Sequence, residues 1–90
     1  MPNFMVVCTF KTGITQEEIA ALIPQERAAA TALQEQGRVG AINLARSRDT
    51  VFIEVIAADR AEAEQTIMKL PMAVLWDLDF YPLTAPISTP

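Results

Sequence analysis

The chain of 90 residues contains no histidine, a single cysteine and only three glycines. The lack of histidine excludes a histidine general base, a histidine-ligated zinc ion and a histidine pH switch. One cysteine cannot form an internal disulfide or a thiolate metal cluster. The glycines, Gly13, Gly37 and Gly40, fit no phosphate-binding loop. We therefore expect a protein without metal or cofactor, whose chemistry rests on carboxylates, arginines, lysines and one tyrosine.

Basic residues are also scarce, since 7 lysines and arginines face 11 acidic residues and the net charge is −4. An acidic chain without a basic run is a poor candidate for binding nucleic acid. No apolar run approaches the roughly 18 residues that a membrane-spanning helix needs. The N-terminus lacks the basic start and small-residue cleavage site of a signal peptide. These features predict a cytoplasmic protein with neither nucleic-acid nor membrane partners.

Apolar residues, in contrast, are plentiful and make up 51% of the chain. A chain this short forms a single domain, which we expect over residues 1–83, followed by an extended tail over residues 84–90. Small domains bury only about 60–65% of the surface that their unfolded chain exposes. Part of the apolar surface is therefore expected to be covered by a partner subunit.

The residue pattern predicts six elements in the order β-α-β-β-α-β. Capping boxes begin the two helices, at Thr15–Glu18 and at Asp59–Glu62, and Pro24 is expected to kink or split the first helix. This order is that of a ferredoxin-like α+β fold with an antiparallel sheet. The expected strands cover residues 4–11, 38–46, 50–57 and 75–81, and the expected helices cover residues 15–36 and 59–70.

The polarity of the strands agrees with this topology. The first and third strands are the most apolar and belong in the centre, whereas Asn43, Asp77 and Asp79 mark the second and fourth as edges. Two helices cover only one face of such a sheet, and Phe52 and Ile56 lie on the other face. An uncovered apolar face favours aggregation in a monomer. We therefore expect a homodimer related by a two-fold axis.

Several short motifs follow one another in an order typical of one enzyme family. In the first helix and its exit turn they are Gln25-Glu26-Arg27, Leu33-Gln34 and Gly37-Arg38. Near the C-terminus they are Leu70-Pro71-Met72, Asp77-Leu78-Asp79 and Leu83. Together, over roughly residues 6–86, they resemble the muconolactone delta-isomerases.

This resemblance implies a dimeric α/β barrel, further assembly into a larger homo-oligomer, and a C-terminal tail that serves as an intersubunit arm. It also implies a cofactor-free shift of a double bond in a lactone by removal and return of a proton. A family glutamate corresponds to Glu26, and Arg27 and Arg38 belong to the matching motifs. Residues 39–44, where the family carries Trp, His and Arg side chains, contain no aromatic residue and no histidine.

The residues themselves offer few groups for proton transfer. Glu26 lies among Ala and Leu positions of the first helix, where burial against the sheet would raise the pKa of its carboxyl. The alternative is a solvated glutamate or one paired with a nearby arginine. Arg46 is a candidate for binding a substrate carboxylate, and Tyr81 is a minor pocket candidate.

Other polar residues have structural explanations. Glu54, a charge within an apolar strand, is expected to pair with Arg46 or Arg48 across the hairpin. Asp77 and Asp79 share one face of an edge strand, where they prevent unwanted strand pairing more readily than they bind a metal.

Two hypotheses therefore stay open. The first is a muconolactone isomerase-like, cofactor-free enzyme that acts on a small lactone or enol acid, with Glu26 as the base and Arg27, Arg38, Arg46 and Tyr81 around the substrate. The second is a non-catalytic module that binds a small ligand or builds an oligomer.

Overall fold

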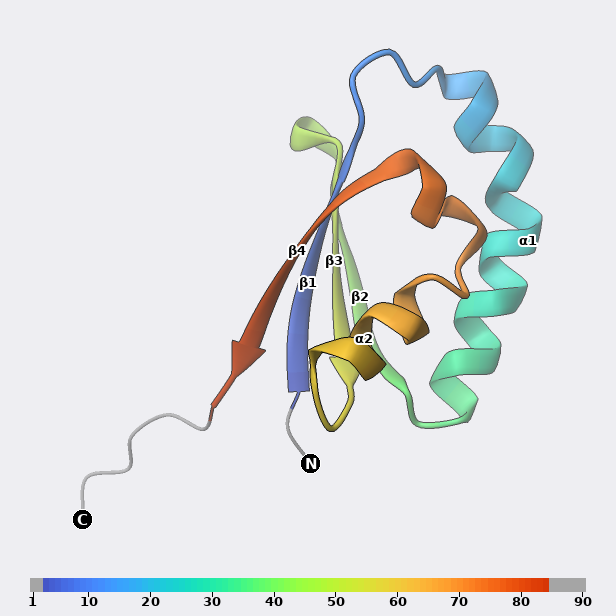
Figure 1. The fold of residues 1–90 in the computed structure, drawn as a ribbon. Helices are drawn as coiled ribbons and strands as arrows, with labels where there is room; N and C mark the ends of the chain where they lie inside the picture. Colours follow the sequence, from blue (N-terminus) through green and yellow to red (C-terminus); the bar gives the residue numbers. More distant parts are fainter. Residues whose placement is uncertain (1–2, 85–90) are drawn as a thin grey trace.

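The computed structural model describes residues 3–84, with only the backbone of Arg48. It contains four strands, two α-helices and two short 3₁₀ helices (Figure 1). The strands are β1 (Asn3–Phe10), β2 (Val39–Ala45), β3 (Thr50–Ile56) and β4 (Trp76–Leu83). The helices are α1 (Gln16–Glu35) and α2 (Arg60–Ile67), and the 3₁₀ helices are η1 (Arg46–Arg48) and η2 (Pro71–Leu75).

The four strands form one antiparallel sheet in the order β2-β3-β1-β4. The two apolar strands β1 and β3 are central, and the more polar strands β2 and β4 are the edges. The predicted α+β architecture, with a four-stranded antiparallel sheet and two helices, is thus confirmed, and it is compatible with a ferredoxin-like fold. The expected tail lies outside the described residues except for Thr84.

Both helices begin at the predicted caps. The Thr15 hydroxyl accepts a hydrogen bond from the Glu18 amide at 3.1 Å, and the Glu18 carboxylate accepts one from the Thr15 amide. The Asp59 carboxylate accepts a hydrogen bond from the Glu62 amide at 2.9 Å. These bonds satisfy amide groups that the first turn of a helix leaves without intrahelical partners.

The first helix is one continuous element that includes Pro24. A proline within a helix leaves the carbonyl four residues earlier, here that of Ala20, without its usual donor. Both Pro24 and Ala20 are exposed, so this carbonyl lies where water reaches it. The proline therefore does not split the helix.

The second helix is shorter than predicted and ends at Ile67 instead of Leu70. The Lys69 and Leu70 amides donate to the carbonyls three residues before them, which tightens the chain into a turn. Leu70 is extended, as the residue before a proline prefers to be, and η2 then begins at Pro71. The chain thus has an extra short helix between α2 and β4.

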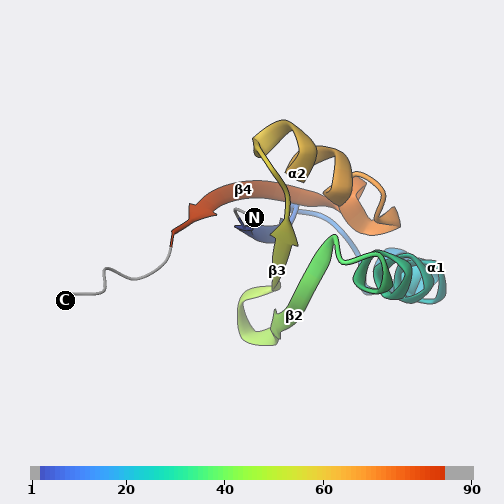
Figure 2. The same cartoon turned by 90° about the horizontal axis from the view of Figure 1, so that it is seen from below.

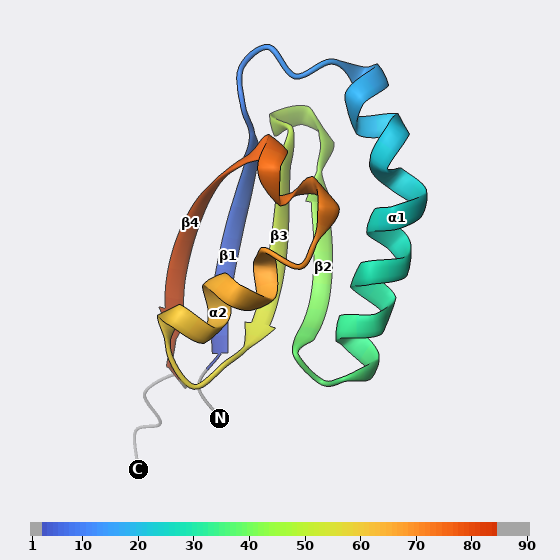
Figure 3. The same cartoon turned by 45° about the vertical axis from the view of Figure 1, so that its right-hand side comes forward.

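The core lies between the sheet and the helices. Alternate residues of the central strands, such as Val6, Cys8, Ile53 and Val55, are almost completely buried on this face. Both helices lie on the same side of the sheet, but α2 lies over the strands while α1 runs beside β2 at the edge (Figures 2 and 3). No helix within residues 3–84 is both long and apolar enough to cross a membrane.

Candidate functional site

The N-terminal two-thirds of α1 forms one wall of a groove over the edge of the sheet. Residues three and four positions apart share one side of a helix. In α1 this stripe carries both apolar and charged side chains. Its members are Ile19, Ile23, Glu26, Arg27 and Ala30, and all of them line a hollow of about 470 Å³, which we call the Glu26 hollow.

Apolar side chains of the sheet form the opposite wall of the Glu26 hollow. Ile42 and Leu44 of β2 are on the helix-facing side of the sheet, yet they are 37% and 59% exposed. They are exposed because α1 stands beside β2 and does not cover it (Figure 3). Phe10 and Trp76 complete this wall, with their rings in an edge-to-face contact at 6.1 Å between centroids.

The backbone of η2 holds the Glu26 carboxylate in place. The Met72 amide donates a hydrogen bond of 2.9 Å to Glu26 Oε1. Met72 lies in the first turn of η2, where an amide has no partner within the helix. Glu26 Oε2 has no hydrogen-bond donor among the described residues, so one oxygen anchors the side chain and the other is available for chemistry.

The surroundings of Glu26 favour the protonated form of its carboxyl. Burial raises the pKa of Glu26 above its ordinary value, and the hydrogen bond from the Met72 amide lowers it by a smaller amount. Such a group binds its proton more tightly than a solvated glutamate does. A carboxyl with a raised pKa is suited to accept a proton and return it near neutral pH.

Cys8 lies deeper in the core. Its thiol is fully buried, and burial together with the nearby Glu26 carboxylate raises its pKa to about 12. The thiol therefore stays protonated and behaves as a small apolar side chain, as expected for a buried cysteine.

Two arginines line the Glu26 hollow together with Glu26. Arg27 comes from α1 and Arg46 from the turn after β2. Neither guanidinium forms an ion pair with any side chain in the described part of the chain. Both are therefore available to an anionic ligand.

Trp76 contributes a further polar group to the wall. Its side chain is only 4% exposed, and its indole N–H has no acceptor among residues 3–84. An unpaired buried donor costs about 1–3 kcal/mol. Since this is the single tryptophan of the chain, all tryptophan fluorescence comes from a residue that lines the Glu26 hollow.

A second hollow of about 420 Å³ continues the groove toward the start of α1. We call it the Gln16 hollow, because Gln16 lines it and does not line the Glu26 hollow. Asp49 and Thr50 lie on its other side. The two hollows, which together we call the α1 groove, share five residues, namely Phe10, Ile19, Ile23, Leu44 and Arg46.

Of the residues predicted to form a site, the structure brings together Glu26, Arg27 and Arg46. Arg38 is exposed in the turn between α1 and β2 and lines neither hollow of the groove. Tyr81 is 55% exposed and belongs to the alternate positions of β4 that face away from the helices. These two residues are thus outside the α1 groove.

Glu54 also lies on the sheet face that the helices leave uncovered. Its carboxylate accepts a hydrogen bond of 3.2 Å from the Asn3 side chain and not from Arg46, which lines the groove instead. The expected pairing of Glu54 with Arg46 is therefore wrong, and the side chain of Arg48, the other expected partner, lies outside the described part of the chain. The carboxylate lies over Gly40, where a Cβ atom would clash with Glu54 Oε1, so this glycine provides the space for it.

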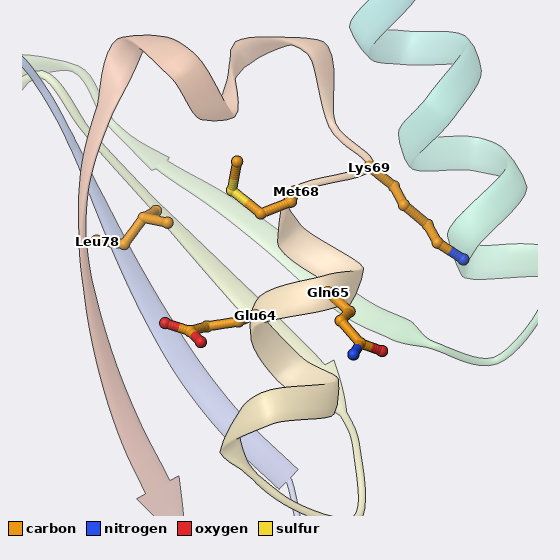
Figure 4. A pocket seen from close by; sticks show the side chains of 5 residues that line it. All are labelled: Glu64, Gln65, Met68, Lys69 and Leu78. Carbon is orange, nitrogen blue, oxygen red and sulfur yellow. The ribbon is translucent and has the colours of Figure 1, made fainter.

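A further hollow of about 580 Å³ lies between α2 and β4 (Figure 4). Its lining side chains are Glu64, Gln65, Met68, Lys69 and Leu78. The Glu64 carboxylate and the Lys69 ammonium point in opposite directions (Figure 4). Their charges do not converge on a common point, and this hollow therefore has no group of charged residues comparable to that of the α1 groove.

Within residues 3–84 no group of three or more Cys, Asp or Glu side chains is placed to hold a metal ion.

Sequence reasoning missed several parts of the site. The Met72 amide that anchors Glu26 belongs to η2, an element that was not predicted, although Leu70-Pro71 signals its start. The apolar wall of Ile42 and Leu44 lies within the strand expected over residues 38–46, but the sequence does not mark it as part of a site. Its role follows only from the position of α1, which periodicity does not determine.

A scan against models of protein families found no match for this chain, and a search of curated protein sequences found no match either.

Proposed function

We propose that the chain is a cofactor-free enzyme that catalyses a proton-shift isomerisation of a small lactone or enol acid in the α1 groove. The observation that carries this proposal is the state of Glu26, a half-buried carboxyl with a raised pKa and one unoccupied oxygen in a largely apolar hollow. The resemblance of the surrounding motifs to the muconolactone delta-isomerases supports the same reaction class.

In the proposed reaction, the Glu26 carboxylate removes a proton from the carbon next to the substrate carbonyl. The electrons of that C–H bond form a dienolate, and Glu26 becomes a neutral carboxylic acid. The same carboxyl then returns the proton to the far end of the conjugated system, and the double bond moves by one position. No other reactant is consumed, and Glu26 is regenerated as a carboxylate.

The arginines supply the electrostatic part of this mechanism. Negative charge develops on the carbonyl oxygen when the proton leaves, and a guanidinium facing that oxygen stabilises the transition state. Arg27 and Arg46 line the same hollow as Glu26, so either one is available to the dienolate and the other to a substrate carboxylate.

The test is proton exchange in D₂O, followed by ¹H NMR on a β,γ-unsaturated γ-lactone acid. We expect the wild-type chain to move the double bond and to incorporate deuterium. The Glu26→Gln variant should be slower by about 100-fold or more, which is the usual contribution of a general base. The matched control is Glu54→Gln, which alters another half-buried glutamate on the opposite face of the sheet and should leave the rate unchanged.

Equal rates for the wild type and the Glu26→Gln variant would remove Glu26 as the base. Saturable binding of the lactone acid without any exchange would instead favour the alternative, a non-catalytic module that holds a small ligand.

The homodimer expected from the sequence belongs to the same proposal. Met5, Val7, Phe52 and Ile56 occupy the uncovered sheet face and are half-buried within a single chain, and a second copy packed on this face would complete a dimeric α/β barrel. Sedimentation equilibrium at micromolar concentration tests it, with a dimer mass as the expected result and a monomer mass as the contradicting one.

A further inference from the structure

The α1 groove is longer than its reactive part. The Glu26 hollow holds the carboxyl and both arginines, and the Gln16 hollow extends it by another 420 Å³. Each of the two already falls within the range of about 300–1,000 Å³ that small-molecule pockets occupy. A bare lactone acid seated beside Glu26 leaves the Gln16 hollow empty.

The walls shared by the two hollows are apolar except for one residue. Phe10, Ile19, Ile23 and Leu44 run from one hollow into the other, and Arg46 is the single charged group among the shared residues. Ile23 and Leu44 are 37% and 59% exposed, and they would gain from being covered by a hydrocarbon chain. The shared walls therefore fit an apolar chain that passes from one hollow to the other.

The charges fix the direction of such a chain. The Glu26 hollow contains two guanidinium groups and only one carboxyl, so positive charge is in excess and attracts an anion. The Gln16 hollow is lined by Asp49 as well as Arg46, and the Asp49 carboxylate repels an anion. An acidic head is thus favoured near Arg27, which lines the Glu26 hollow alone. A tail that runs toward Gln16 packs on the apolar walls that both hollows share, because the residues that line the Gln16 hollow alone are mostly polar.

From these observations we propose that the substrate is an amphipathic acid, in which the reactive acidic head occupies the Glu26 hollow and a linear hydrocarbon tail of several carbons occupies the Gln16 hollow. The assignment of the head as the reacting part rests on the function proposed above. The presence of the tail and the direction in which it lies rest on the shape and charge of the groove alone.

The experiment uses unreactive probes, so that it does not depend on turnover. Straight-chain carboxylates from butanoate to dodecanoate are titrated into the full chain, and the fluorescence of Trp76 is followed. Burial of a methylene contributes about 0.8 kcal/mol, which corresponds to about a fourfold gain in affinity. We expect the affinity to rise two- to fourfold with each added methylene and then to level off when the tail leaves the groove. The 1-alkanols of equal length should bind at least tenfold more weakly, because they lack the anion.

Two variants separate the tail from the head. Leu44→Ala should weaken the dependence on chain length, whereas Val74→Ala, which shortens an apolar side chain that is also mostly exposed but lies outside the groove, should not. Arg46→Gln should lower the affinity for every carboxylate by a similar factor and change alkanol binding little.

Affinity that is independent of chain length, or equal for acids and alkanols, would overturn the proposal. Failure to bind any of the probes would also overturn it, since the groove would then have another occupant. If chain-length dependence holds but no proton exchange is found, the proposed function alone fails. If short lactones exchange protons and tail length has no effect, the amphipathic substrate alone fails.

Discussion

The two helices of this chain pack on the same side of one sheet, but they bury very different shares of their side chains. The short helix α2 buries Ala63, Thr66 and Ile67 within eight residues, and the Arg60 guanidinium lies 5.0 Å from the centre of the Phe80 ring on β4. The long helix α1 has 20 residues, of which only Leu33 is buried. Thus α2 contributes mainly to the core, and α1 contributes mainly to the groove.

The helix α1 packs against the core through partly buried side chains, namely Ile19, Leu22, Ala29 and Ala30, and further contacts fix it. Near its C-terminal end Leu33 is buried, and the Gln34 side chain donates a hydrogen bond of 3.0 Å to the Gly40 carbonyl on β2. In its middle, Glu26 accepts a hydrogen bond from the Met72 amide. Between its start and Glu26 the helix faces the α1 groove. This comparison shows how a small fold divides its apolar side chains between a buried core and the walls of an exposed groove.

The largest expected effect comes from the same substitution made in each helix. Ile67→Ala removes a completely buried side chain and should cost about 2–5 kcal/mol of the free energy of unfolding. Ile23→Ala removes a side chain that lines the groove, and it should cost about 1 kcal/mol or less, since little packing is lost and alanine favours a helix. Urea denaturation of the two variants measures both values. Equal costs would contradict the division between core and groove.

Removal of either helix cap should reduce stability by an intermediate amount. The loss should affect the whole protein for α2 and only the first turn for α1. Thr15→Ala and Asp59→Ala each remove a side chain that accepts a hydrogen bond from an amide of the first turn, at a cost of about 1 kcal/mol. For α2, which is part of the core, the cost should appear in global unfolding. For α1, we expect a local opening of the first turn, visible as faster hydrogen exchange of the first amides of the helix. Faster exchange throughout the protein in the Thr15→Ala variant would show that the start of α1 belongs to the core.

The smallest expected effect concerns the pH dependence of stability. Because the folded state raises the pKa of Glu26, the folded chain binds this proton more tightly than the unfolded chain does. The contribution of Glu26 to stability is therefore complete at pH values below its unfolded pKa, and it is lost as the pH rises through the folded pKa. The Glu26→Gln variant lacks this loss. Its melting temperature relative to the wild type should increase from acidic to neutral pH, and a constant difference across this range would contradict the raised pKa.

Much of the fold could be predicted from the sequence because local signals and topology agree. The capping box at Thr15 and the side-chain cap at Asp59 determine where the helices begin, and the alternation of apolar residues determines the central strands. The end of α2 could not be predicted in the same way. There the preference of Leu70 for an extended backbone before Pro71 outweighs the helical pattern.

The site was less predictable than the fold. Glu26 was identifiable because it is the one carboxylate in the middle of α1, where Ala and Leu positions surround it. The residues that give it its properties are distant in the sequence: the Met72 amide is 46 positions away, and the wall of Ile42 and Leu44 belongs to an edge strand. Their meeting depends on α1 standing beside the sheet, which is a tertiary feature.

The most direct test of this account is an NMR titration of the Glu26 carboxyl, observed through its ¹³Cδ signal. We predict a midpoint above the ordinary range of glutamate, because the carboxyl lies in a largely apolar groove. A Glu26 midpoint in the ordinary glutamate range would show that water solvates this carboxyl, and it would contradict the proposal that proton transfer takes place in the α1 groove.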